Sequence, residues 1–139
     1  MIQHIIPMIS DEKPIQQKLR KIHPNLENKI KTKLNKLLKE KLIFPVIHSK
    51  WVSNLVPVRK KNGDIRICID FMNLNKAYQK ESFPLPTMEQ VLETLAGFEL
   101  MYFLYGFSRY NQILVHLDDR FNTTFRTKGG TYAYLKMSF

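Results

Sequence analysis

The residues best suited to chemistry in this 139-residue chain are cations, and they gather in its first 80 positions. Residues 1–80 hold 17 Lys and Arg against 6 Asp and Glu, whereas residues 81–139 hold 5 against 6. Such an excess attracts polyanions, because binding releases the counterions that surround them. A solvated basic face has the same pattern, so charge alone leaves nucleic-acid binding and simple solubility equally open.

Metal chemistry has weaker candidates. Asp118 and Asp119 are adjacent, so a strand would point their side chains in opposite directions, and a turn explains them more simply. The four histidines lack the spacing of metal ligands, and Cys68, the single cysteine, excludes an intrachain disulfide and a Cys-rich zinc site. An intracellular setting is therefore expected. The apolar N-terminal run, interrupted by Pro7, predicts neither a signal peptide nor a membrane anchor.

The basic half of the chain must be positioned by a helix, which we predict from Asn25 to about Glu40. Its apolar residues recur at spacings that place them on one helix face. These residues are Leu26, Ile30, Leu34, Leu37 and Leu38. Pro24 suits the first turn, and Glu27 is expected to pair with Lys31, four residues later.

A basic β-hairpin is predicted next. The strand-like runs Val52 to Arg59 and Ile65 to Asp70 are joined by Lys60-Lys61-Asn62-Gly63-Asp64. The Asn-Gly pair can take the positive φ angles of a tight turn. Alternation places the three isoleucines of the second run on one face and Arg66 on the opposite, polar face.

The second half of the chain predicts one short helix followed by strands. Thr87 and Gln90 form a capping-box pattern before a helix expected from Met88 to Ala96, which Gly97 would end. Turns are expected at 118–119 and 128–130. The expected strands are Leu100 to Tyr105, Ile113 to Leu117, Thr123 to Thr127 and Tyr132 to Met137.

Six blocks of this sequence resemble reverse transcriptases of gypsy-type long-terminal-repeat retrotransposons, especially those of plants. The resemblance runs from about Lys13 to Phe139 without an evident gap. The blocks are Lys13-Pro14-Ile15-Gln16-Gln17-Lys18-Leu19-Arg20, Trp51-Val52-Ser53-Asn54, Lys60 to Phe71, Leu74-Asn75-Lys76, Phe83-Pro84-Leu85-Pro86 and Phe103 to Ile113.

The resemblance implies an α+β fold, the fingers and partial palm of a right-hand polymerase, with antiparallel strands and packed helices. Residues 13–139 would form this partial domain, and residues 1–12 would be a flexible linker. The family continues with a Tyr-x-Asp-Asp hairpin and a thumb, so we expect a truncated chain with unpaired sheet edges and uncovered apolar surface. Lys41 stands where the family usually has a helix-ending Gly, and a left-handed backbone there would cost about 1 kcal/mol.

The resemblance also implies two-metal nucleotidyl transfer, in which three aspartates bind Mg²⁺. Tyr105 occupies the position of the first aspartate, and the other two would lie beyond Phe139. A phenol is neutral at pH 7 and is a poor Mg²⁺ ligand. We therefore expect no intact catalytic residue and no cofactor in this chain.

Five other residues receive roles from the resemblance. Lys61 and Arg66 match residues that grip the triphosphate of the incoming nucleotide, and Tyr110 matches the aromatic residue beneath its sugar. Lys60 and Trp51 are candidate contacts to nucleic acid. Each has an alternative role: the hairpin cations as solubilising charges, and Trp51 and Tyr110 as packed core aromatics.

The sequence thus predicts a degenerate, truncated reverse transcriptase domain of a retrotransposon polyprotein. The family activity is RNA-directed DNA polymerisation, which this chain is not expected to catalyse. Two alternatives stay open: a non-catalytic basic module that binds nucleic acid, and a pseudogene product without function. Weak, sequence-independent binding of RNA or DNA is expected, and no membrane is expected as a partner.

Overall fold

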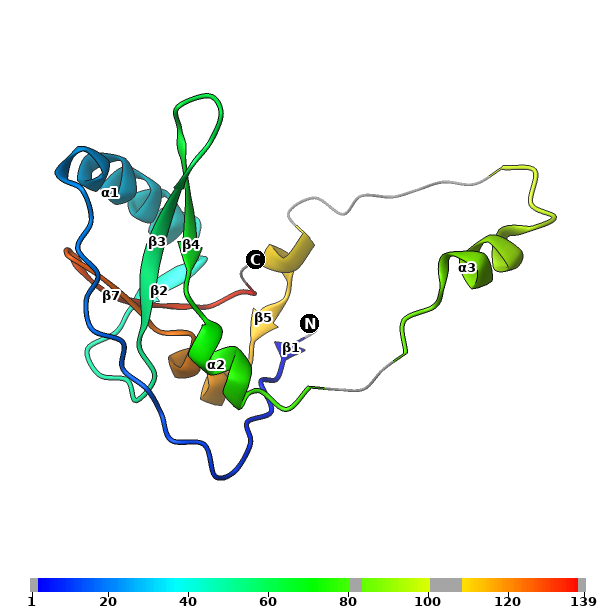
Figure 1. Ribbon diagram of the computed structural model, residues 1–139, viewed down its shortest axis with the longest axis horizontal. Helices are drawn as coiled ribbons and strands as arrows, with labels where there is room; N and C mark the ends of the chain where they lie inside the picture. Colours follow the sequence, from blue (N-terminus) through cyan, green and yellow to red (C-terminus); the bar gives the residue numbers. More distant parts are fainter. Residues whose placement is uncertain (1–2, 81–83, 101–108, 138–139) are drawn as a thin grey trace.

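The structure is a computed structural model that describes residues 3–80, 84–100 and 109–137. These residues form a mixed α+β fold in which helix α1 (Pro24–Lys39) packs against a five-stranded sheet (Figure 1). The predicted α+β class is confirmed.

The five-stranded sheet has the order β2-β7-β6-β3-β4. Neighbouring strands are antiparallel except β3 and β6, which are parallel and align Ser53 with Phe125. The expectation of antiparallel strands is corrected at this pair, because β3 and β6 are joined by a long connection rather than a hairpin. The strands are β2 (Ile43–Pro45), β3 (Ser53–Arg59), β4 (Ile65–Ile69), β6 (Phe125–Thr127) and β7 (Gly130–Tyr134).

Helix α1 matches its prediction to within one residue at each end. Ile30 and Leu34 are buried, and His23 caps the start by accepting a hydrogen bond from the Asn25 N–H at 3.3 Å. At the other end Lys41 has φ +54°. The Leu42 N–H donates to the Leu37 carbonyl and the Lys41 N–H to the Leu38 carbonyl, both at 3.0 Å. These are the two hydrogen bonds of a Schellman motif.

The main core lies between α1 and the sheet. Phe125 is fully buried at its centre, with its ring 5.4 Å from that of Tyr134 between centroids. Leu55 of β3 and Ile65 of β4 are also buried there. The apolar faces of the helix and the hairpin thus meet in one cluster. This contact fixes the position of the hairpin relative to α1.

The predicted hairpin is confirmed, with β3 paired to β4 from Leu55 opposite Ile69 to Arg59 opposite Ile65. Of the Asn-Gly pair only Gly63 takes a positive φ, +78°. The connection is therefore a five-residue loop, Lys60 to Asp64, rather than a two-residue turn.

A short helix that the sequence analysis missed, α2 (Met72–Ala77), follows the hairpin. The Met72 N–H donates to the Asp70 side chain at 3.3 Å, a local signal that precedes the helix. Leu74 and Ala77 of this helix bury Trp51 in a second small core.

Helix α3 (Met88–Leu95) confirms the predicted capping box, since Thr87 and Gln90 exchange both expected hydrogen bonds. Gly97 has φ +97° beyond its end. The helix stands apart from the sheet, and none of its residues is buried (Figure 1).

The strands expected after α3 are shorter than predicted. Strand β5 covers only Leu114–Val115, and 101–105 of the strand expected at 100–105 lie outside the described residues. The turn expected at 118–119 is part of a 3-10 helix, η2 (Leu117–Thr123), because Asp119 and Arg120 N–H groups both donate to the His116 carbonyl. A second 3-10 helix, η1, covers Arg109–Gln112.

The N-terminal residues make specific contacts with the rest of the chain. Strand β1 (Gln3–His4) pairs in parallel with β5. The Ile6 N–H donates to the Asp119 carboxylate at 2.8 Å, and the Ile9 N–H to the Ala77 carbonyl at 2.9 Å. The Asp119 carboxylate therefore helps to hold the N-terminal segment in place.

Candidate nucleic-acid and phosphate interface

The hairpin loop that carries the candidate cations is closed by its own hydrogen bonds. The Lys60 N–H donates to the Asp64 carbonyl at 2.8 Å, and the Gly63 N–H to the Lys60 carbonyl at 3.0 Å. The Asn62 side chain accepts a hydrogen bond from the Asp64 N–H at 3.1 Å. This turn chemistry satisfies several backbone polar groups of the loop, while the side chains of Lys60 and Lys61 stay exposed.

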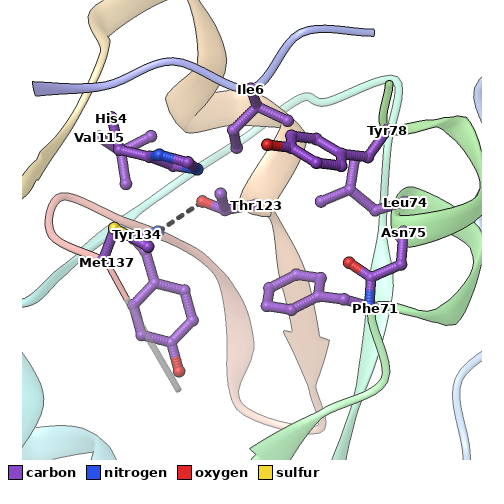
Figure 2. Close-up of a pocket in the computed structure, with 10 residues that line it drawn as sticks. All are labelled: His4, Ile6, Phe71, Leu74, Asn75, Tyr78, Val115, Thr123, Tyr134 and Met137. Atoms are coloured by element: carbon purple, nitrogen blue, oxygen red, sulfur yellow. Dashed lines mark hydrogen bonds between the residues drawn. The ribbon is translucent and has the colours of Figure 1, made fainter. Parts of the chain in front are cut away.

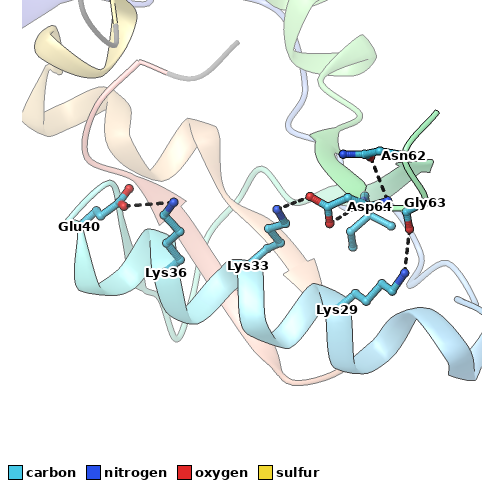
Figure 3. A network of polar contacts seen from close by, with 8 residues as sticks. Lys29, Lys33, Lys36, Glu40, Asn62, Gly63 and Asp64 are labelled. Carbon is cyan, nitrogen blue, oxygen red and sulfur yellow. Dashed lines mark hydrogen bonds and ion pairs between the residues drawn. The ribbon is translucent and has the colours of Figure 1, made fainter. Parts of the chain in front are cut away.

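Helix α1 holds the loop from one side (Figure 3). The Lys33 ammonium forms an ion pair of 2.8 Å with the Asp64 carboxylate, and the Lys29 ammonium donates to the Gly63 carbonyl at 2.8 Å. Sequence reasoning missed both contacts, because they join residues more than 30 positions apart and no local pattern marks them. They fix the loop relative to the helix.

The Asp64 carboxylate is the charged centre of this attachment. Its pKa lies below the usual value, chiefly because Lys33 donates a hydrogen bond to it and also because it accepts the Ile65 N–H. Asp64 is thus engaged with the helix and its own backbone.

Four cations of the hairpin remain exposed: Arg59, Lys60, Lys61 and Arg66. None of them forms an ion pair within the described part of the chain. Arg66 lies opposite Val58 in the ladder, while its neighbours Ile65 and Ile67 contact the core under α1. The structure therefore brings the predicted residues Lys60, Lys61 and Arg66 together on one hairpin.

The predicted aromatic residues lie elsewhere. Trp51 is only 6% exposed and packs against Leu74 and Ala77, which favours the core role over contact with a template. Tyr105 lies outside the described residues. Tyr110 belongs to η1, but its side chain is not among those described, so its role beneath a sugar stays a prediction.

Carboxylates do not converge in the part of the chain that the structure describes. No group of three or more His, Cys, Asp or Glu side chains there could hold a metal ion. Asp119 receives the Ile6 N–H, and Asp118 lies 3.6 Å from the His116 ring nitrogen. Across the same residues, no helix combines the length and apolar character of a membrane span.

A small cavity of about 200 Å³ lies between β1, α2 and β7 (Figure 2). Its walls are mainly apolar, with Ile6, Leu74 and Val115 among them. The hydroxyl of Thr123 accepts the Tyr134 N–H at 2.9 Å beside the cavity. This hydroxyl supports the end of β7, and the mainly apolar walls favour a gap in the packing over an active site, which needs converging reactive groups.

Comparison with known proteins identifies the relatives of the chain. No model of a known protein family matches the sequence. It is 30% identical over 138 residues to the retrovirus-related Pol polyprotein from transposon 412 of Drosophila melanogaster, which covers 94% of this chain and 11% of that protein. The chain is a homologue of retrotransposon Pol polyproteins. The Tf2-3 polyprotein of Schizosaccharomyces pombe is 30% identical over 109 residues, covering 76% of this chain and 8% of that protein.

Solved structures show the fold of this Pol homologue. The native protease-reverse transcriptase of prototype foamy virus matches with a TM-score of 0.74 at 20% identity, over 98% of this chain and 18% of that chain. The foamy viral enzyme in complex with an RNA/DNA hybrid matches with a TM-score of 0.73 at 16% identity, over 99% of this chain and 18% of that chain. The predicted reverse transcriptase fold is confirmed. The homologue spans about a tenth of the length of the curated relatives.

Proposed function

We propose that this chain is a gypsy-type reverse transcriptase module that binds phosphate groups at its basic hairpin and does not catalyse nucleotidyl transfer. One observation carries the proposal. Four exposed cations without ion-pair partners among the described residues lie on one hairpin, two of them in the loop and two at the strand ends beside it, and Lys29 and Lys33 of α1 hold that loop. Cations held in place lose less conformational freedom when they bind a polyanion, which favours binding over mere solubility.

The lack of catalysis follows from the ligand set. Two-metal transfer requires several carboxylates around ions about 4 Å apart. In this chain a phenol, Tyr105, stands at the first aspartate position of the family, and the described Asp118 and Asp119 are engaged in other contacts. These residues do not fit the Mg²⁺ ions that the family uses.

The partner we propose is RNA or DNA. The foamy viral reverse transcriptase has been solved with an RNA/DNA hybrid and with double-stranded DNA, and these complexes support nucleic acid as the ligand class. Contacts from Lys and Arg to phosphate position a protein without reading sequence, so we propose weak and non-specific binding. We further propose an intracellular setting, because the single thiol, Cys68, is free.

Duplex binding at increasing salt tests the hairpin. Replacing both Lys60 and Lys61 by Gln removes two phosphate contacts, so the slope of log affinity against log salt should fall in magnitude by about 1.8. Replacing both Lys76 and Lys80 by Gln is the matched control, since it removes the same charge from exposed positions after the hairpin. Equal slopes in the two double variants would overturn the hairpin as the binding element.

Triphosphate binding separates a surviving nucleotide corner from a general basic surface. A nucleoside triphosphate should shift amide resonances of Lys60 to Arg66 in the wild type and much less in Arg66→Ala, because a planar guanidinium binds phosphate through two parallel hydrogen bonds. Shifts that Arg66→Ala leaves unchanged would leave only the alternative of a non-catalytic nucleic-acid-binding module.

Primer extension tests the proposed inactivity. The chain should extend no primer on RNA or DNA templates with Mg²⁺ or Mn²⁺, and Tyr105→Asp should not restore extension, since one carboxylate cannot hold two metals. Template-dependent incorporation above a control without protein would contradict this part of the proposal.

A further inference from the structure

Helix α3 presents an apolar face without a partner in the described chain. Met88, Val91, Leu92 and Leu95 lie at spacings of three, one and three, which places them on one side of the helix. The Leu92 side chain is 59% exposed, and none of the residues of this helix is buried. An eight-residue helix is marginal in water without packing, so this face favours a partner.

The charge of α3 is uniformly acidic. Residues 84–100 contain three Glu and no Lys or Arg, although the chain as a whole carries a net charge of +10. Glu89 and Glu93 lie on the helix itself. The segment around α3 is thus both apolar and acidic, and the basic surfaces of the protein attract it electrostatically.

A groove of about 930 Å³ lies between residues 19–22, α1 and the turn from β6 to β7, and we call it the α1 groove. Leu19, Ile22 and Tyr132 supply apolar surface, and Arg20, Lys21 and Lys31 supply positive charge. The acidic residue in the groove, Glu27, is already paired with Lys128 at 2.8 Å, so the three cations are left uncompensated by it.

We propose that the α1 groove of one chain receives helix α3 of a second copy. The apolar face of α3 matches the apolar surface of the groove, and its glutamates match the cations of the groove. Single-stranded nucleic acid suits the groove less well, because such sites use aromatic stacking platforms and this groove has one aromatic side chain, Tyr132.

The arrangement of the molecule determines the form of the assembly. α3 and α1 lie on opposite sides of the molecule (Figure 1), so the two contact surfaces are different and each copy has one of each. Two copies that exchange their α3 helices reciprocally satisfy both contacts and close into a symmetric dimer. This surface is separate from the basic hairpin, so the inference stands apart from the function proposed above.

Mass measurement in solution tests the association. Light scattering from about 10 to about 500 µM protein should show a mass approaching twice the 16.5 kDa of one chain as concentration rises. Leu92→Glu should weaken dimerisation at least tenfold, whereas Met72→Glu, an equally drastic change at an exposed apolar residue of α2, should not. A monomer at every concentration, or equal effects of the two substitutions, would overturn the proposal.

A mixing experiment identifies the two surfaces. The double variant Leu19→Glu, Lys31→Glu damages the groove and keeps α3, while Leu92→Glu damages α3 and keeps the groove. All three positions are exposed, and circular dichroism should confirm that both variants stay folded. Each variant alone should be monomeric, and their mixture should form a heterodimer through the one intact contact.

A mixture that stays monomeric would overturn the proposal, because an intact groove and an intact α3 would then fail to bind each other. A groove variant that still dimerises by itself would overturn it too, because pairing between two α3 helices gives that result. A groove variant that loses affinity for an oligonucleotide while its dimerisation is unchanged would also overturn it, and would assign the groove to nucleic acid.

Discussion

Asp64 shows how one carboxylate organises a basic surface. It joins the hairpin loop to Lys33 of α1, and its second oxygen accepts the Ile65 N–H at 2.8 Å. The exposed cations beside it are thereby left free to meet a ligand. Because the Asp64 pKa is lowered in the folded chain, this contact stabilises the fold above the ordinary pKa of the carboxyl group. The contribution is lost as pH falls through the folded-state pKa.

The Asp64 contact gives a prediction for pH dependence. The Ile65 amide resonance should titrate with a midpoint below 3.8, the ordinary value for the carboxyl group, and Lys33→Met should move that midpoint toward 3.8. Lys36→Met is the matched control. It removes the same charge from α1, but Lys36 pairs with Glu40 and not with Asp64. Equal midpoints in the two variants would show that Lys33 does not cause the shift.

At the scale of elements, α1 is set by local signals at both ends. Pro24 and the His23 cap begin it, and the Schellman hydrogen bonds around Lys41 end it. The positive φ of Lys41 shows that the backbone there is left-handed, the case that the sequence analysis considered, and identifies a strained residue. The helix that holds the hairpin therefore ends at a position where glycine would fit better.

Replacing Lys41 by Gly should raise the free energy of unfolding by about 1 kcal/mol, because glycine adopts a left-handed backbone without a Cβ penalty. The control is Lys31→Gly, an exposed position in the middle of α1, which should lower it by about 0.5–1 kcal/mol. Denaturant unfolding at low protein concentration measures both. If Lys41→Gly does not stabilise the protein, the left-handed backbone of Lys41 carries no strain.

The described part of the molecule has a main core between α1 and the sheet and a second small core around Trp51, and its periphery is apolar in many places. Exposed large apolar side chains occur on the N-terminal segment, α2, α3 and η2. Strands β2 and β4 are the edges of the five-stranded sheet. Stability therefore depends on a few buried residues such as Leu55 and Phe125.

Shortening a buried side chain of this core should lower the free energy of unfolding more than shortening an exposed one. Leu55 is 1% exposed, so Leu55→Ala should reduce the free energy of unfolding by about 2–5 kcal/mol through lost burial and a cavity. Val58 lies on the same strand but is 46% exposed, and Val58→Ala should change stability by less than about 0.5 kcal/mol. Similar losses from both substitutions, measured by denaturant unfolding, would contradict a core centred on Leu55.

The sequence by itself determined the elements that depend on neighbouring residues. The apolar stripe and Pro24 located α1, the Thr87–Gln90 capping box located α3, and Gly63 located the hairpin. Each signal lies within a single element and relates residues no more than four positions apart, so it can be read without knowing how the elements pack. The resemblance to retrotransposon reverse transcriptases was also readable from sequence blocks, and it is confirmed by the homology to retrotransposon Pol polyproteins and by the fold.

Only the tertiary structure decided which distant groups meet. Glu27 pairs with Lys128, 101 positions away, instead of its helical neighbour Lys31, and Lys33 takes Asp64 as its partner. The parallel pairing of β3 with β6 and the burial of Trp51 are of the same kind. Such contacts depend on how whole elements pack around a shared core, because many partners suit each charge or strand edge locally. Packing geometry then leaves only one within reach.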